Sequence, residues 1–219
     1  MITGENTKTN NLCIGSETMN KSRVSMIKDN KGVSVIEMIV IIAIMAVLST
    51  SAFVAMTYIT RTDIKKESKM LYSVITSSRT SSMARSGKWI FGISQAADGD
   101  FSLRIIHASS FDESTGTLGV LTEHEVEKLG EKVNFIQVNI VQADGTETGY
   151  MDLTSISFKK NTGAVEKIND FVVTESDTGI SCAYVGGHTA KSGGYADIKI
   201  NVANNEKVFR LYFITGEME

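Results

Sequence analysis

The sequence predicts an α+β protein in which one long N-terminal helix packs on a C-terminal antiparallel β-sheet. Apolar residues recur at helical spacing up to about residue 84, and apolar and polar residues alternate from residue 88 onward. The 219 residues are 42% hydrophobic and 21% charged, which is ordinary for a protein with a packed core. A sheet with one apolar face is expected to bury the amphipathic half of the helix.

The first half of the predicted helix is long and apolar enough to cross a bilayer. Residues 38–60, MIVIIAIMAVLSTSAFVAMTYIT, are 23 consecutive residues without a formal charge. A helix of this length spans the roughly 30 Å hydrocarbon core of a membrane. A cleavable secretory signal fits poorly because its apolar core is roughly 7 to 15 residues long. Basic residues are equally frequent on both sides, so charge bias does not set the orientation.

A single carboxylate interrupts the start of this apolar stretch. Glu37 follows Val33-Ser34-Val35-Ile36, and Lys31 is six residues away, too far to be a helical neighbour. A charge well inside a bilayer costs about 2.5 to 3.5 kcal/mol, so it usually has a partner. Cleavage after Gly32 would create a cation, the amine of Val33, that Glu37 of a neighbouring subunit could pair with. On position alone, an ordinary signal anchor whose glutamate reaches headgroup water explains the pattern equally well.

The segment GVSVIEMIVIIAIMAVL resembles the class III signal of type IV pilins and type II secretion pseudopilins. The shared features are a basic leader ending in Gly, a hydrophobic residue, and Glu at the fifth position of an apolar helix. The resemblance implies cleavage by a prepilin peptidase between Gly32 and Val33, N-methylation of Val33, and an assembly role for Glu37. It implies the pilin fold and no cofactor, metal or catalytic residue in this chain, so the protein is not expected to be an enzyme.

The resemblance also implies a domain organisation and partners. Residues 1–32 would be the leader peptide, residues 33–60 the transmembrane and assembly half of the helix, and residues 61–219 an extracytoplasmic head. The partners would be the prepilin peptidase/methyltransferase, other pilin or pseudopilin subunits, an inner-membrane assembly platform, and the lipid bilayer before assembly. The protein would be a single-pass cytoplasmic membrane protein that later reaches a pilus or pseudopilus at the cell surface.

Two features depart from the family pattern. The family often has a helix-softening Gly and Pro within the apolar segment, at positions that are Ala46 and Val54 here. Because both breakers are missing, a continuous helix is predicted. The leader is long at 32 residues, whereas a start at Met26 would leave a leader of seven residues, MIKDNKG.

The helix is predicted to continue past the apolar segment to about residue 84, with Ile64, Leu71, Val74 and Ile75 as a core stripe. A further short helix is predicted after residue 121. Its signals are a capping box formed by Thr122 and Glu125 and a terminating Gly130. Strands are predicted at 89–93, 101–107, 133–141, 149–158, 171–174, 180–185, 196–202 and 208–214.

Two details sharpen the β-sheet prediction. Asp144-Gly145 between two of these strands predicts a tight hairpin turn. Phe209, Leu211 and Phe213 place apolar side chains on one face of the last strand. The stretches SVITSSRTSSMARSGKWIFGI and VFRLYFITGEME resemble the minor pseudopilin H and FimT-like group.

The sequence contains no recognisable catalytic or metal-binding motif. His107, His124 and His188 are far apart in the chain, and the position four after His124 is Lys128 rather than the His of HExxH. A calcium site formed by acidic loop residues is a less favoured alternative. Its candidate ligands are Asp98, Asp100, Asp112 and Glu113. Cys182 would be the one thiol after removal of the leader, and it is expected to be a small buried hydrophobe.

The charge balance argues against nucleic acid as a partner. Removing residues 1–32 takes away five of the 22 Lys and Arg and three of the 25 Asp and Glu, which leaves a formal net charge of -5. The leading hypothesis is a structural, minor subunit of a type IV pilus or of a type II secretion or competence pseudopilus. The alternatives are a signal-anchored extracytoplasmic enzyme or binding domain, and a DNA-uptake pilin with a locally basic loop.

Overall fold

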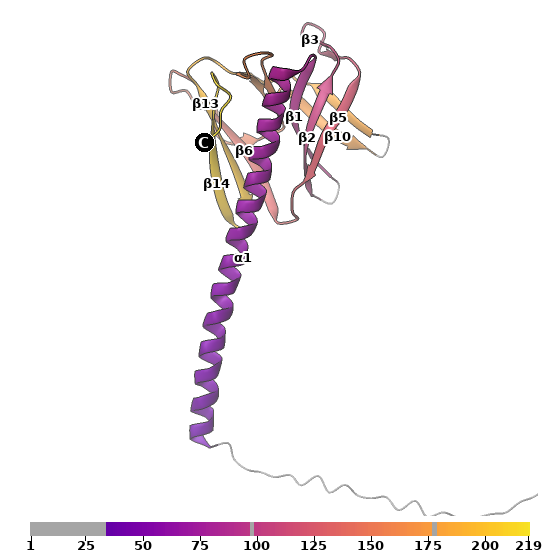
Figure 1. Cartoon of the computed structure of the whole chain (residues 1–219). Coiled ribbons are helices and arrows are strands. Elements are labelled where there is room, and N and C mark those ends of the chain that lie inside the picture. The colour runs from indigo at the N-terminus through magenta and orange to yellow at the C-terminus, as the bar shows by residue number, and fades with distance from the viewer. Residues whose placement is uncertain (1–33, 97–98, 177–178) are drawn as a thin grey trace, which may run out of the picture. The chain divides into compact units, whose positions relative to one another are not determined.

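The structure, a computed structural model, describes residues 34–96, 99–176 and 179–219. The predicted processing positions Gly32 and Val33 lie outside the described residues. The fold is α+β: one long helix, α1 (Val35–Ala84), precedes a region of mostly antiparallel sheet (Figure 1). Contacts divide the chain into two units after Ala46, a position inside α1.

Helix α1 contains neither Gly nor Pro over its 50 residues, and it runs without a break, as its sequence predicts. It ends where the chain reaches Gly87, whose backbone φ is +86°. A β-carbon at Gly87 would lie 2.2 Å from Nε2 of His107, so this position needs glycine for space as well as for conformation. The reversal at Gly87 leads the chain directly into the first strand.

Strands occupy the rest of the chain. The bounds are β1 (Lys88–Gln95), β2 (Phe101–Ala108), β3 (Phe111–Asp112), β4 (Thr117–Leu118), β5 (Leu121–Lys128), β6 (Val133–Val141), β7 (Met151–Asp152), β8 (Ser155–Phe158), β9 (Val165–Ile168), β10 (Phe171–Ser176), β11 (Gly179–Tyr184), β12 (His188–Thr189), β13 (Tyr195–Val202) and β14 (Asn205–Tyr212). A six-stranded sheet has the order β12-β9-β8-β1-β2-β5, and a four-stranded sheet has the order β14-β13-β6-β7. The short hairpins β10-β11 and β3-β4 complete the fold, and all named pairs are antiparallel.

The second half of α1 packs on both large sheets. Its predicted core stripe is confirmed, because Ile64, Leu71, Val74 and Ile75 are all buried. They share one hydrophobic cluster with side chains of β1 and β2 in the six-stranded sheet and of β6, β13 and β14 in the four-stranded sheet. Figure 1 shows α1 running between the strands β6 and β14 and the strands β1 and β2. Burial of each such aliphatic side chain contributes about 1.5 to 3 kcal/mol to folding.

Several predicted strands match the structure closely. Strand β6 has the predicted bounds, and the predicted inward face of the last strand is confirmed because Phe209, Leu211 and Phe213 are buried. The predicted hairpin turn is also present. Gly145 has a φ of +82°, and the N–H of Gln142 donates to the carbonyl oxygen of Thr146 at 2.9 Å.

The predicted short helix near Thr122 is wrong, because this segment is strand β5. β5 pairs along its length with β2, with an irregularity between Ile105 and Ile106, so pairing with a distant strand overrides the local capping signal. The predicted strand 149–158 is in fact two strands: β7 pairs with β6 in one sheet and β8 pairs with β1 in the other. Strand β9 was not predicted, since its four residues are too few to show a period.

A buried carboxylate just before strand β10 is held by two serines of strand β8. Asp170 is 1% exposed, and its two oxygens accept hydrogen bonds from the hydroxyl groups of Ser155 and Ser157, at 3.1 and 2.7 Å. Burial raises the pKa of Asp170, while these hydroxyls and the nearby Lys88 partly oppose the shift. The folded state therefore holds this proton more tightly than the unfolded state does.

This raised pKa predicts how stability depends on pH. Because the folded pKa lies above the unfolded one, the contribution of Asp170 to stability falls as pH rises from the ordinary aspartate range through the folded pKa. Asp170→Asn should be more stable than the wild type at pH 7 and should show a flatter dependence between pH 4 and 7. Urea unfolding followed by the fluorescence of Trp89, the single tryptophan, measures this. Asp144→Asn is the control, since a hydrogen bond from Thr146 lowers the pKa of that exposed carboxyl. A wild-type slope that persists in Asp170→Asn would contradict the assignment.

Candidate functional site: the apolar half of helix α1

The first half of α1 exposes its apolar side chains. Val35 is 76% exposed, Phe53 is 71% exposed and Ile59 is 54% exposed. The other large apolar side chains of this half that are exposed are Ile36, Met38, Ile39, Val40, Ile41, Ile42, Ile44, Met45, Val47, Leu48, Val54, Met56 and Tyr58. Soluble proteins rarely expose a contiguous apolar patch larger than a few hundred Å², so such a surface marks a site of interaction with a membrane or with protein.

Helix α1 is long and apolar enough to cross a membrane. Within the described residues, α1 is the one helix of which this is true, and it lies near the N-terminus. None of its most apolar stretch is buried. A core helix of a soluble protein would instead be mostly buried.

Glu37 lies in the first turn of α1, and its side chain is exposed. A carboxylate in this turn interacts favourably with the positive end of the helix dipole, which helps to start the helix here. Its helical neighbours at three and four positions on are Val40 and Ile41. Among the residues that the structure describes, therefore, the helix offers this carboxylate no cation. Of the three predicted site residues, Glu37 alone lies in the described part, so its distance from Gly32 and Val33 is outside the structure.

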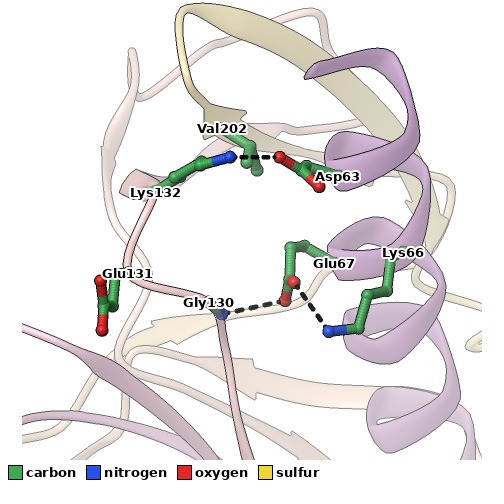
Figure 2. A pocket seen from close by; sticks show the side chains of 7 residues that line it. All are labelled: Asp63, Lys66, Glu67, Gly130, Glu131, Lys132 and Val202. Carbon is green, nitrogen blue, oxygen red and sulfur yellow. Dashed lines mark hydrogen bonds and ion pairs between the residues drawn. The ribbon is translucent and has the colours of Figure 1, made fainter. Parts of the chain in front are cut away.

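The helix changes from exposed to buried at residues 61–67, where a loop from the sheet region holds it. The carboxylate of Asp63 lies 2.8 Å from the ammonium of Lys132, and the carboxylate of Glu67 accepts the N–H of Gly130 at 3.2 Å. We call these two contacts the clamp. They line a cavity of about 230 Å³ together with Lys66, Glu131 and Val202 (Figure 2).

The clamp was not predicted from the sequence. Asp63 and Glu67 lie one helical turn apart and flank Ile64 on the buried side of an amphipathic helix, which is the signal that could have identified them. Glu67 is 4% exposed and lies 3.7 Å from the ammonium of Lys66. The carboxylates of Asp63 and Glu67 already have cationic or N–H partners. We therefore interpret the contacts that line this cavity as fixing the helix to the sheet region.

The structure brings two of the three histidines together. The rings of His107 and His124 each stack on Trp89 with centroids 4.7 Å apart, and the two imidazoles lie 5.8 Å from each other. His188 lies apart from them on β12. Across the described ranges, no group of three or more His, Cys, Asp or Glu side chains is placed to hold a metal ion.

Asp112 and Glu113, two of the four acidic residues considered as calcium ligands, make other contacts in the structure. Asp112 accepts hydrogen bonds from the backbone N–H and the hydroxyl of Ser114, at 2.9 and 2.7 Å. Glu113 pairs with Lys167, and Asp98 is not among the described residues. These local contacts account for Asp112 and Glu113 as loop-stabilising groups.

Cys182 is a free thiol that is half-buried on β11. Burial raises the pKa of this thiol to about 12, and the nearby carboxyl of Asp170 adds to the shift. The thiol is therefore protonated at neutral pH, and a thiolate nucleophile is not available here. This agrees with its predicted role as a small packing residue, although it is less buried than expected.

The described region thus offers an exposed apolar helix with a carboxylate in its first turn as its most distinctive surface. No protein-family model, no curated protein and no solved structure matches this chain.

Proposed function

We propose that this chain is the precursor of a structural subunit, of the minor type, of a type IV pilus or of a type II secretion or competence pseudopilus. In this proposal a prepilin peptidase cleaves after Gly32, Val33 is N-methylated, and the apolar half of α1 first anchors the subunit in the membrane and then joins a helical bundle. The observation that carries the proposal is the exposed apolar half of α1 with Glu37 in its first turn. The residues after it form the extracytoplasmic head.

Two physical arguments are consistent with polymerisation. A surface this apolar needs cover, which lipid supplies before assembly and other apolar helices would supply in a filament. A carboxylate at the start of the helix gains a partner only if a cation arrives from elsewhere. The amine of a neighbouring subunit's first residue, Val33 after cleavage, is such a cation, and pairing with it would fix the axial register between subunits.

A signal-anchored enzyme or binding domain is the second candidate, and the same exposed helix favours it. Such a protein needs the anchor but has no use for a new amine at Val33. A DNA-uptake role would require a locally basic exposed loop, whereas removal of the leader leaves the chain acidic overall. Processing at the N-terminus separates the first two candidates directly.

The test is mass spectrometry of the N-terminal peptide, recovered separately from membranes and from sheared surface filaments of the native host. The expected result is a chain that begins at Val33, carries one added methyl group and is present in the filament fraction. An intact leader in every fraction, with nothing in the sheared material, would reject assembly and leave the signal anchor.

A further inference from the structure

The charged residues that follow the apolar half of α1 are sorted by sign. Arg61, Lys65, Lys66 and Lys69 are all exposed, and Lys66 remains 70% exposed beside Glu67. We call these four residues the basic collar. The two acids in the same stretch, Asp63 and Glu67, belong to the clamp and are turned toward the loop that contains Gly130 and Lys132; Lys66 reaches Glu67 on that side (Figure 2).

Helix geometry explains this separation. At about 100° per residue, the four cations fall within an arc of about 140° around the helix. Ile64, Glu67 and Leu71, which are buried, lie on the opposite side. Asp63 is paired with Lys132 of the loop, and Glu67 lies 3.7 Å from Lys66 of the collar. The three other cations of the collar therefore present an unbalanced positive surface outward. Arg61, Lys65 and Lys69 form no ion pair within the described part of the chain.

The collar directly follows Thr60, the last residue of the uncharged segment 38–60. At about 1.5 Å per residue it extends over about 12 Å of helix, whereas the headgroup layer on each side of the hydrocarbon core is roughly 5 to 8 Å thick. If the apolar half of α1 fills the hydrocarbon core, Arg61, Lys65 and Lys66 lie at headgroup depth. Lys69 lies just above them, within reach of its flexible side chain.

We propose that the basic collar binds the phosphate groups of anionic phospholipids in the leaflet nearest the head. This inference rests on the membrane insertion that the proposed function contains. Lys and Arg are strong donors to phosphate oxygens, and clusters of them beside a membrane span bind anionic headgroups. The competing occupant is an acidic face on the head of a second copy. The collar belongs to the same helix as the membrane-spanning segment, so lipid headgroups surround it before assembly. This proximity favours lipid over a second copy as the occupant.

The collar would hold the unassembled subunit at a defined depth. Sinking by one helical turn would pull Arg61 into hydrocarbon, and rising by one turn would separate it from the phosphate layer. The clamp would also fix the depth of the head, because Asp63 and Glu67 lie within the same two helical turns as the collar and bind the loop at Gly130 and Lys132.

The full chain is reconstituted in nanodiscs containing equal amounts of phosphatidylglycerol and phosphatidylcholine, and native mass spectrometry counts the lipids that each ejected chain retains. The collar variant carries Arg61→Gln, Lys65→Gln, Lys66→Gln and Lys69→Gln. The matched control removes four exposed cations far from the collar in sequence, with Arg85→Gln, Lys159→Gln, Lys160→Gln and Lys191→Gln. Basic residues of the leader are common to all three proteins, so differences between them report the head side.

Wild type and control should retain phosphatidylglycerol preferentially. One cation near an anionic surface strengthens binding by about fivefold, so the collar variant should lose at least about tenfold of this preference. Equal retention by the collar variant and the wild type would overturn the proposal. Unchanged lipid retention with loss from filaments would assign the collar to a second copy instead.

The outcome is separable from that of the proposed function. Retention of phosphatidylglycerol through the collar in a chain that is never cleaved at Val33 would support the collar and reject the pilin assignment. A chain that fails to enter the bilayer at all would reject both.

Discussion

Glu37→Ala is expected to leave cleavage after Gly32 intact and to reduce the amount of the chain in sheared filaments by at least about tenfold. The carboxylate gains a partner only in the assembled bundle, where an unpaired charge costs about 2.5 to 3.5 kcal/mol. Alanine removes that cost but also removes the pairing with the Val33 amine that selects one register, so many registers become equivalent. Quantitative blotting of membrane and sheared fractions measures the ratio.

Two variants serve as controls for this prediction. Glu37→Asp keeps the charge on a side chain one methylene shorter and should retain part of the incorporation. Gly32→Leu should block cleavage, so the uncut chain accumulates in membranes and no filament form appears. Normal incorporation of Glu37→Ala, in an assay that depends on this subunit, would show that the carboxylate does not set the register.

Leu71→Ala is expected to destabilise the head by about 2 to 5 kcal/mol. Leu71 is fully buried in the cluster that joins α1 to both large sheets, so truncation leaves a cavity with little freedom to collapse. Urea unfolding of the full chain in detergent, followed by the fluorescence of the buried Trp89, measures the change.

The neighbouring residue supplies the control for the Leu71 prediction. Tyr72→Ala removes a larger side chain one position along the same helix, but Tyr72 is 41% exposed. Its replacement should change the free energy of unfolding by no more than about 0.5 kcal/mol. Equal effects of the two variants would mean that α1 is not packed on the sheets as described.

The features that the sequence predicts well are those with a long local period. Helix α1 and the face containing Ile64, Leu71 and Val74 follow from spacing over many turns. Glu37 could also be identified from the sequence, because a single charge within an apolar segment can be recognised without knowledge of the fold. Strand β5 was mispredicted because its capping signal is local, whereas the pairing with β2 that decides its conformation comes from another segment.

Other features depend on contacts between distant parts of the chain. The 149–158 segment reads as one strand, but its two ends pair with different sheets. The clamp joins Asp63 to Lys132 and Glu67 to Gly130, residues separated by 69 and 63 positions. No spacing rule reaches across such intervals. The meeting of His107 and His124 at Trp89 arises in the same way, from the alignment of neighbouring strands.

The clamp also has a mechanical meaning. A pull on the apolar half of α1 reaches the sheets first at Asp63 and Glu67, in the earliest turns of the helix that touch them. One of these two attachments is a partly exposed ion pair and the other is a hydrogen bond accepted by a buried carboxylate. Salt weakens the first and leaves the second nearly unchanged. A partly exposed ion pair is also the weaker attachment. Under tension the base of the head is expected to loosen at Asp63 first, while Glu67 and the apolar core beyond it still hold.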